Sequence, residues 1–327
     1  MGVFSAKGGV GKTTLTANLG ASLVSEFNKT VCLIDGNVTA ANLGLYYGLY
    51  YSPVTLYDVL NSRTPINTAI YIHPSGVRIL PSPISVNKLD ISVKGLSKHL
   101  CKLEGYDHII VDSPPSLTRQ TIECLNLVEQ ALLVATPDAP AVTDAAKMAI
   151  HAEKNGVEIL GLVINRVRNR SYELTIDEIQ SIAGIDVIGM IPEHENVQRS
   201  LADGKPEVLK NPYSDFSTEV NKIASAVFGL EYNPPSVLDK IKFWVGMGHS
   251  QGSRTEDFEK QKSKKAFVPK RVYRIPIRPE AKTKRYESDS TTEDTYGMED
   301  QLKTEIMGML RDSIREKLRE STRRNDK

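Results

Sequence analysis

A glycine-rich segment close to the N-terminus constrains the fold of this chain more than any other feature. It reads Lys7-Gly8-Gly9-Val10-Gly11-Lys12-Thr13-Thr14 and lies between an apolar run, Met1–Ser5, and a segment of helical spacing, Thr14–Phe27. A strand, a glycine-rich turn and a helix N-terminus together present inward-pointing N–H groups and a positive dipole end, which suit phosphate. The segment therefore predicts a phosphate-binding loop in an α/β fold.

The residue types in this loop each have a chemical use. Lys12 can neutralise charge on β- and γ-phosphates, and the Thr13 hydroxyl is a ligand for Mg²⁺. Ala6 stands where the generic pattern has its first glycine, so that position does not need a backbone conformation reserved for glycine. A glycine-rich turn without a ligand is the alternative interpretation. We predict phosphate contacts from the following residues: Lys7, Gly8, Gly9, Val10, Gly11, Lys12, Thr13 and Thr14.

Apolar runs and helix-period segments alternate up to about residue 230. The predicted strands are Met1–Ser5, Thr30–Asp35, Val77–Leu80, Asp107–Asp112, Ala131–Ala135, Ile159–Asn165 and Val187–Ile191, and the predicted helices include Thr14–Phe27, Leu117–Val128, Val142–Asn155 and Ser217–Val227. Such alternation is typical of βα units that build a parallel sheet. We predict a P-loop NTPase fold with a doubly wound, mostly parallel sheet flanked by helices.

Charge and proline divide the 327 residues into a folded part and a tail. Residues 231–327 carry 22 Lys and Arg against 17 Asp and Glu, whereas residues 1–230 carry 19 against 23. The periodic pattern stops before Pro234 and Pro235, and proline opposes continued helix or sheet. We predict an ATPase domain over 1–232, a charged linker over 233–298 and a C-terminal amphipathic helix over 299–323, in a largely disordered tail with short helices.

The tail contains candidate interaction elements. One is a short amphipathic helix near 236–245, whose apolar stripe comprises Val237, Leu238, Ile241, Trp244 and Val245. This stripe and its lysines suit an anionic membrane surface, and packing against the folded domain is the alternative. A basic block over 260–285 could contact lipid, nucleic acid or an acidic protein, and is otherwise a solvated run. The terminal helix, apolar at every fourth position from Leu302 to Leu318, suits a protein partner or self-association.

Several classes of protein are disfavoured. No apolar run reaches the roughly 20 residues that span a bilayer, and the N-terminus lacks a secretory pattern, so we expect a cytoplasmic protein. The three cysteines include no CxxC pair, which argues against a disulfide framework or a local metal cluster. The six histidines show no metal-binding spacing, so Mg²⁺ is the one predicted metal.

Lys7 makes the loop more specific, because an ordinary phosphate loop does not need a lysine before its glycines. Here the chain resembles the deviant Walker A ATPases of the MinD/ParA class, particularly archaeal MinD proteins, over roughly residues 1–230. The segment 31–37 followed by Ala41-Asn42-Leu43-Gly44-Leu45 is similar to their switch I, and Ile109-Ile110-Val111-Asp112-Ser113-Pro114-Pro115 to their Walker B and switch II. Thr136-Pro137-Asp138, Asp144, Asn165-Arg166 and Ile191-Pro192-Glu193 occupy the places of later family signatures.

The resemblance implies roles for these residues. Lys7 would reach the nucleotide of a partner subunit, and Asp144 would lie at the same dimer interface. Asn165 would recognise the adenine, and Arg166 and Pro192 would belong to the nucleotide-binding site. For Asn165 and Asp144 the alternatives are a turn residue and a helix-surface aspartate. Asp35 and Asp112 both end apolar runs, at the sheet edge where ligands of doubly wound folds bind. We predict that these two carboxylates and Thr13 hold Mg²⁺, although either aspartate alone could be a cap or turn residue.

One position departs from the family pattern. Asn37 stands two residues after Asp35, where the family has an aspartate linked to placing the attacking water. An amide carries no charge and is no general base, but it can orient water. We therefore count Lys7, Lys12 and Asn37 as the candidate catalytic residues and expect slow hydrolysis.

Together these features predict a Mg²⁺-dependent ATPase that dimerises when ATP is bound and acts in spatial positioning, of a division site or a polar or surface structure. The cofactors are then ATP and Mg²⁺. The expected partners are a second copy of the chain, an anionic membrane at the inner face of the cell and a protein bound by the tail. The alternatives are a ParA-like DNA or cargo partition ATPase, supported by the basic tail, and a slowly hydrolysing nucleotide-gated adaptor.

Overall fold

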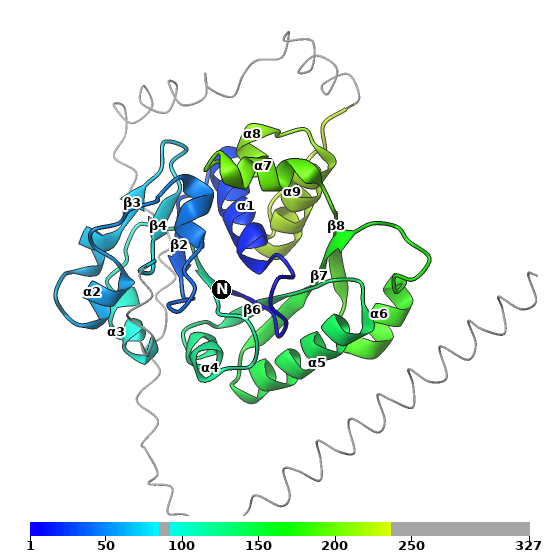
Figure 1. Ribbon diagram of the computed structural model, residues 1–327, viewed down its shortest axis with the longest axis horizontal. Coiled ribbons are helices and arrows are strands. Elements are labelled where there is room, and N and C mark those ends of the chain that lie inside the picture. Colours follow the sequence, from blue (N-terminus) through cyan, green and yellow to red (C-terminus); the bar gives the residue numbers. More distant parts are fainter. Residues whose placement is uncertain (85–91, 237–327) are drawn as a thin grey trace, which may run out of the picture. The chain divides into compact units, whose positions relative to one another are not determined.

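The computed structural model describes residues 1–84 and 92–236, and the strands of these residues form one eight-stranded sheet. Along the sheet the order is β3-β4-β2-β5-β1-β6-β7-β8, with every neighbouring pair parallel except β3 and β4 (Figure 1). The strands are β1 Gly2–Phe4, β2 Val31–Asp35, β3 Tyr71–Ile72, β4 Arg78–Leu80, β5 His108–Asp112, β6 Gln130–Ala135, β7 Glu158–Val167 and β8 Val187–Pro192.

Helices cover both faces of this sheet (Figure 1). They are α1 Lys12–Ser25, α2 Leu56–Leu60, α3 Ser97–Leu100, α4 Arg119–Leu125, α5 Ala139–Lys154, α6 Ile176–Ala183, α7 Glu195–Ala202, α8 Glu207–Lys210 and α9 Asp215–Phe228, with 3₁₀ turns η1 Leu43–Tyr47, η2 Ile66–Ala69 and η3 Lys94–Leu96. Buried side chains of α2 to α6 share one hydrophobic core, and those of α1, η1, α8 and α9 share the other.

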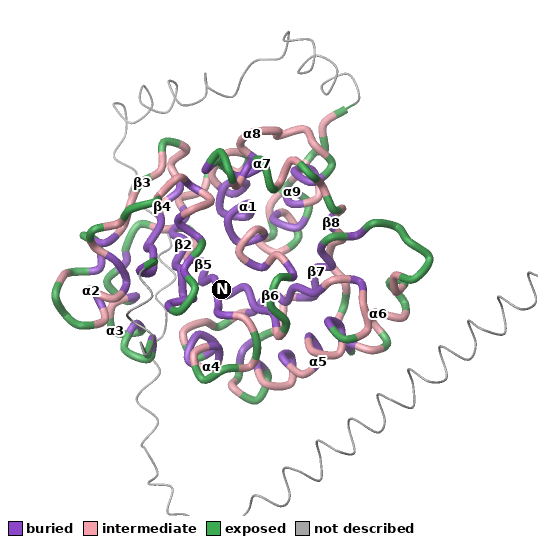
Figure 2. The backbone as a smooth tube through the Cα atoms, viewed as in Figure 1, coloured by how far each residue is buried: buried purple, intermediate pink, exposed green. Residues whose placement is uncertain are grey.

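The strand sequences explain why both faces are covered. In β2, Val31 and Leu33 belong to one core while Cys32 and Ile34 belong to the other, and all four are fully buried. A strand that is apolar at every position needs packing on both of its faces, as in parallel α/β sheets. Figure 2 shows the consequence, a buried centre with exposure concentrated in the outer loops and helix surfaces.

The structure confirms the predicted fold class, and each predicted strand is present. The short antiparallel edge strand β3 was not predicted, because two residues carry too little periodicity. α1 begins at Lys12 instead of Thr14, so Lys12 and Thr13 belong to its first turn. α9, the last helix of the described part, ends at Phe228 with Gly229 in the left-handed conformation, φ 62°.

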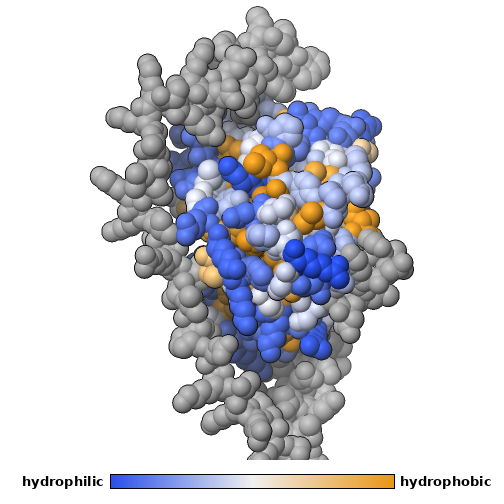
Figure 3. Space-filling model, turned by 90° about the vertical axis from the view of Figure 1, so that its left-hand side faces the viewer, coloured by the Kyte–Doolittle hydropathy of each residue, from blue (hydrophilic) through white to orange (hydrophobic). Residues whose placement is uncertain are grey.

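Other predictions concern residues outside this description. Outside it lie the helices predicted near 236–245 and over 299–323 and the five residues of the apolar stripe. The linker predicted over 233–298 also lies outside it, except for residues 233–236. The boundary at residue 232 stays a prediction. No helix among the described residues is long and apolar enough to cross a membrane. On the face shown in Figure 3, hydrophobic residues form small separate areas among hydrophilic ones.

A half-buried histidine gives the domain an expected pH dependence. His108 packs against the Phe228 ring at 4.4 Å between centroids, and burial lowers its pKa from 6.5 to about 4. Between these values the unfolded chain binds a proton that the folded one does not, so this group makes stability fall as pH drops from about 6.5 to 4. We expect the thermal unfolding midpoint to fall less steeply with decreasing pH in His108→Gln than in the wild type. An equally steep fall in both proteins would contradict the assignment.

Candidate functional site

The sheet order brings three strand ends together. β1 lies between β5 and β6, and the glycine-rich loop leaves its carboxyl end. β2 and β5 are neighbours, and Asp35 and Asp112, their last residues, are directly paired in register. The two predicted carboxylates therefore lie side by side next to the loop, at the edge where doubly wound sheets bind ligands.

The loop ends in a helix N-terminus that lacks a side-chain cap. Gly11 occupies the cap position of α1 in the left-handed conformation, φ 92°, and no acidic residue lies in the first turn. By contrast, Asp138 caps α5 with a side-chain acceptor. The N–H groups of the first turn of α1 have no intrahelical acceptor, so this end favours an anion. A Cβ atom at Gly11 would lie 2.1 Å from Asn165 Nδ2, which makes glycine necessary here.

A buried ion pair joins the loop to β5. Lys12 Nζ lies 2.9 Å from Asp112 Oδ1, and the two side chains are 6% and 1% exposed. Thr13 Oγ1 donates to Asp112 Oδ2 at 2.6 Å, and Thr16 Oγ1 donates to Asp112 Oδ1 at 3.2 Å. The Thr13 hydroxyl and the Asp112 carboxylate thus present adjacent hard oxygens, the ligand type that Mg²⁺ prefers.

Asp35 braces the loop that follows β2. Its Oδ1 accepts from the Asn37 N–H at 3.1 Å, and its Oδ2 accepts from the N–H groups of Asn42 and Leu43 at 3.2 and 3.1 Å. Burial, reinforced by the charge of Asp112, raises the pKa of Asp35 to about 7. A divalent cation beside Asp35 would favour its charged form. The donor set fits Mg²⁺, with Thr13 and Asp112 as the holding residues and Asp35 beside them.

The structure places Asn37 in its own turn. Asn37 Nδ2 donates to the Ala40 carbonyl at 2.9 Å, and Asn37 Oδ1 accepts from the Ala40 N–H at 3.3 Å. The residue is 6% exposed. Its amide therefore fixes the conformation of residues 37–40 directly after the switch-like strand.

The two predicted interface residues are accessible. Lys7 is 45% exposed, and its Nζ lies 3.2 Å from Asp138 Oδ1 at the start of α5. Asp144, farther along α5, pairs with Lys147 at 3.1 Å. Both positions therefore meet the first requirement of a residue that acts across subunits, which is access to solvent in the single chain.

The nucleotide-binding residues predicted outside the loop, Asn165, Arg166 and Pro192, lie at the ends of β7 and β8. Asn165 is 5% exposed, and its Nδ2 donates to the Val10 carbonyl at 2.8 Å. Arg166 follows with φ 61°, and Pro192 ends β8 opposite Val167. The amide of Asn165 thus holds the phosphate loop, a contact that sequence reasoning did not predict. Adenine recognition by Asn165 and nucleotide contact by Arg166 and Pro192 remain predictions.

Sequence reasoning also missed two contacts of the loop. Asp138 was placed among the family signatures without a role, and the structure gives it the Lys7 ammonium. Tyr46, in η1, was not singled out, and its hydroxyl lies 2.7 Å from Thr14 Oγ1. Neither contact has a local signal, because the partners are 131 and 32 residues apart.

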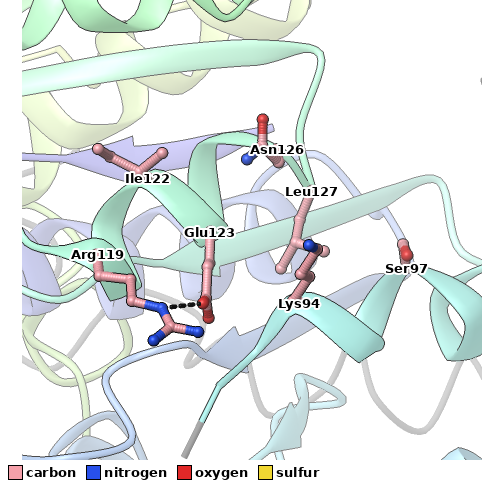
Figure 4. Close-up of a pocket in the computed structure, with 7 residues that line it drawn as sticks. All are labelled: Lys94, Ser97, Arg119, Ile122, Glu123, Asn126 and Leu127. Atoms are coloured by element: carbon pink, nitrogen blue, oxygen red, sulfur yellow. Dashed lines mark hydrogen bonds and ion pairs between the residues drawn. The ribbon is translucent and has the colours of Figure 1, made fainter. Parts of the chain in front are cut away.

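A separate pocket of about 570 Å³ lies at α4 and the η3–α3 segment (Figure 4). Its described lining consists of Lys94, Ser97, Arg119, Ile122, Glu123, Asn126 and Leu127. Arg119 Nε donates to Glu123 Oε1 at 3.1 Å, and the Val93 N–H donates to Glu123 Oε2 at 2.9 Å. The described lining contains none of the predicted site residues.

Fold and site together define a P-loop nucleotide-binding protein. The family described as CobQ/CobB/MinD/ParA nucleotide binding domain matches residues 1–208, and the chain belongs to this family. An uncharacterized ATP-binding protein of Methanocaldococcus jannaschii is 33% identical over 243 residues, covering 74% of this chain and 92% of the relative.

Two solved structures extend the likeness. The cell division ATPase MinD of Pyrococcus furiosus has a TM-score of 0.66 and 31% identity, covering 70% of this chain and 98% of that one. The septum site-determining protein MinD of Pyrococcus horikoshii, complexed with Mg-ADP, has a TM-score of 0.65 and 32% identity, covering 69% and 94%. The predicted resemblance to MinD/ParA proteins is confirmed.

Proposed function

We propose that this protein binds Mg²⁺ and ATP at the phosphate loop, dimerises in the ATP state, and hydrolyses ATP as a switch that positions a cellular structure. The observation that carries the proposal is the cluster of Lys12, Thr13 and Asp112 at the uncapped N-terminus of α1, in which Lys12 and Asp112 are buried. The similar MinD of P. horikoshii holds Mg-ADP, and that of P. furiosus is a cell division ATPase.

The chain's own residues divide the work on the nucleotide. The first-turn N–H groups of α1 bind phosphate oxygens, and the Lys12 ammonium neutralises charge on the transferring phosphoryl group. Mg²⁺, which Thr13 and Asp112 would hold, would further neutralise charge on the phosphates. Lys7 of each subunit acts on the nucleotide of the other, which requires the Lys7 ammonium to leave Asp138. Dimerisation and turnover are thereby coupled through one side chain.

In this proposal hydrolysis is slow because residue 37, which orients the attacking water, is an asparagine. Its amide cannot take a proton from water but can orient it, while its bonds to Ala40 keep the turn in place. We expect Asn37→Ala to lower kcat by about 10-fold, the worth of one hydrogen bond, without changing nucleotide affinity. Thr39→Val is the matched control, since Thr39 bonds Asn37 Oδ1 from the same turn. An unchanged kcat in Asn37→Ala would remove the residue from the mechanism.

The positioning role requires a surface to which the dimer is recruited. We assign this to the tail, with the stripe Val237, Leu238, Ile241, Trp244 and Val245 as the membrane element of a peripheral protein at the inner face of the membrane. Two stripes in an ATP-bound dimer bind by avidity where one binds weakly.

Phosphate release from ATP tests the proposed activity. The assay compares MgATP with ATP in excess chelator, for the wild type and for Lys12→Ala. Turnover that needs both Mg²⁺ and Lys12 supports the proposal. A rate equal in all four arms would refute it, because the activity would then not come from this site.

A further inference from the structure

Two successive tyrosines fasten η1 onto α1. The Tyr46 hydroxyl lies 2.7 Å from Thr14 Oγ1, in the first turn of α1, and the Tyr47 hydroxyl donates to the Ala17 carbonyl at 2.6 Å. Both bonds connect the 3₁₀ turn that follows the switch-like loop to the helix that begins at the phosphate site. Only the first of them ends on a predicted phosphate-binding residue.

The direction of the Tyr46 bond matters for the ligand. Either hydroxyl can donate in this pair. Phosphate oxygens only accept hydrogen bonds, so Thr14 must keep its own proton for the ligand, and Tyr46 must then donate to Thr14 Oγ1. Such a chain of two hydroxyl groups strengthens the outer bond, because each bond polarises the next.

The acidity of the two hydroxyl groups favours that direction, because a phenol, with a pKa of about 10, is a stronger acid and a better donor than an aliphatic alcohol. Burial raises the pKa of the Tyr46 phenol, so the group keeps its proton at neutral pH. A protonated phenol is a good donor, and the Thr14 oxygen is the partner that the structure gives it.

The same turn is tied to Asp35. The N–H groups of Asn42 and Leu43, at the start of η1, donate to Asp35 Oδ2. The connections therefore run from the Asp35 carboxylate through η1 and Tyr46 to Thr14. A phosphate bound at Thr14 and a cation beside Asp35 are linked by one short, hydrogen-bonded segment.

We propose that Tyr46 is a positioning residue for the nucleotide: its hydroxyl donates to Thr14 Oγ1 and thereby aims the Thr14 proton at a phosphate oxygen. The inference rests on the proposed nucleotide binding and extends it to a residue of η1. Tyr46 acts through Thr14 and does not itself touch the ligand.

Titration calorimetry with MgADP tests this role in a double-mutant cycle of Tyr46→Phe and Thr14→Val. Tyr46→Phe is expected to raise the dissociation constant roughly 3- to 10-fold, the worth of one hydrogen bond, and to have no further effect in the Thr14→Val background. Tyr47→Phe is the matched control: it removes the neighbouring hydroxyl bond and lowers thermal stability, but leaves the dissociation constant unchanged.

The outcomes separate the two proposals. If the wild type binds MgADP and Tyr46→Phe binds equally well, or weakens binding equally in both Thr14 backgrounds, the positioning role is overturned while nucleotide binding stands. If the wild type itself fails to bind MgADP, the proposed function falls, and the role of Tyr46 falls with it.

Discussion

Replacing Lys12 with methionine is expected to lower the free energy of unfolding of the nucleotide-free protein by about 3–5 kcal/mol. Lys12 is the buried cation paired with Asp112, and Asp35 lies beside that pair. Without the ammonium, the buried Asp112 carboxylate has no counter-charge and lies next to the buried Asp35 carboxylate. Methionine lacks only the position of the terminal ammonium nitrogen and keeps the unbranched chain up to there, so the loss reports mainly on charge and not on a large cavity. Urea unfolding followed by far-UV circular dichroism measures it.

Two comparisons isolate this effect. Lys7→Met removes the exposed ion pair with Asp138, and exposed pairs contribute at most about 1 kcal/mol. Adding Asp112→Asn to Lys12→Met removes the stranded charge and is expected to restore part of the loss. A loss in Lys12→Met no larger than in Lys7→Met would show that the buried pair does not stabilise the fold.

The second large effect is on turnover. We expect Lys7→Ala to lower kcat by about 10³-fold, as removal of a cation supplied in trans does in related phosphoryl-transfer enzymes, while MgADP affinity stays the same. The reason is the position of Lys7, which is half-exposed and paired with Asp138 at the start of α5, whereas Lys12 is buried against Asp112. Steady-state phosphate release and calorimetry measure the two quantities.

Lys222→Ala serves as the control for this prediction. Lys222 is also half-exposed and paired with a carboxylate, Glu219, on α9. Lys222→Ala is expected to change neither kcat nor the affinity for MgADP. If Lys7→Ala abolishes MgADP binding, Lys7 acts within its own subunit and the trans role is wrong.

The sequence predicted the elements whose signals are local. The loop motif, the apolar runs and the carboxylates that end them are read from neighbouring residues, and the parallel sheet then brings Asp35 and Asp112 together. β3 escaped prediction because a strand of two residues has no measurable alternation. The predicted start of α5, Val142, is three residues later than the observed start at Ala139, because its cap, Asp138, was not recognised as one.

Contacts between distant residues could not be predicted in the same way. Asn165 was expected at the adenine, yet the sequence holds no sign that its amide also supports Val10, 155 residues away. The Tyr46–Thr14 bond depends on how η1 packs on α1, which is a tertiary property. The asparagine at position 37 departs from the family pattern, but its bonds to Ala40 appear only in the folded turn.

The central claim is a dimer that forms with ATP and needs Lys7. Sedimentation velocity of the full chain with Mg²⁺ and a non-hydrolysable ATP analogue, with MgADP, and without nucleotide tests it most directly, for the wild type and Lys7→Ala. We predict that the wild type is a dimer with Mg²⁺ and the analogue and a monomer in the other two conditions. Lys7→Ala is predicted to be a monomer in every condition. A wild type that is monomeric throughout, or a Lys7→Ala dimer equal to the wild type, would contradict the account.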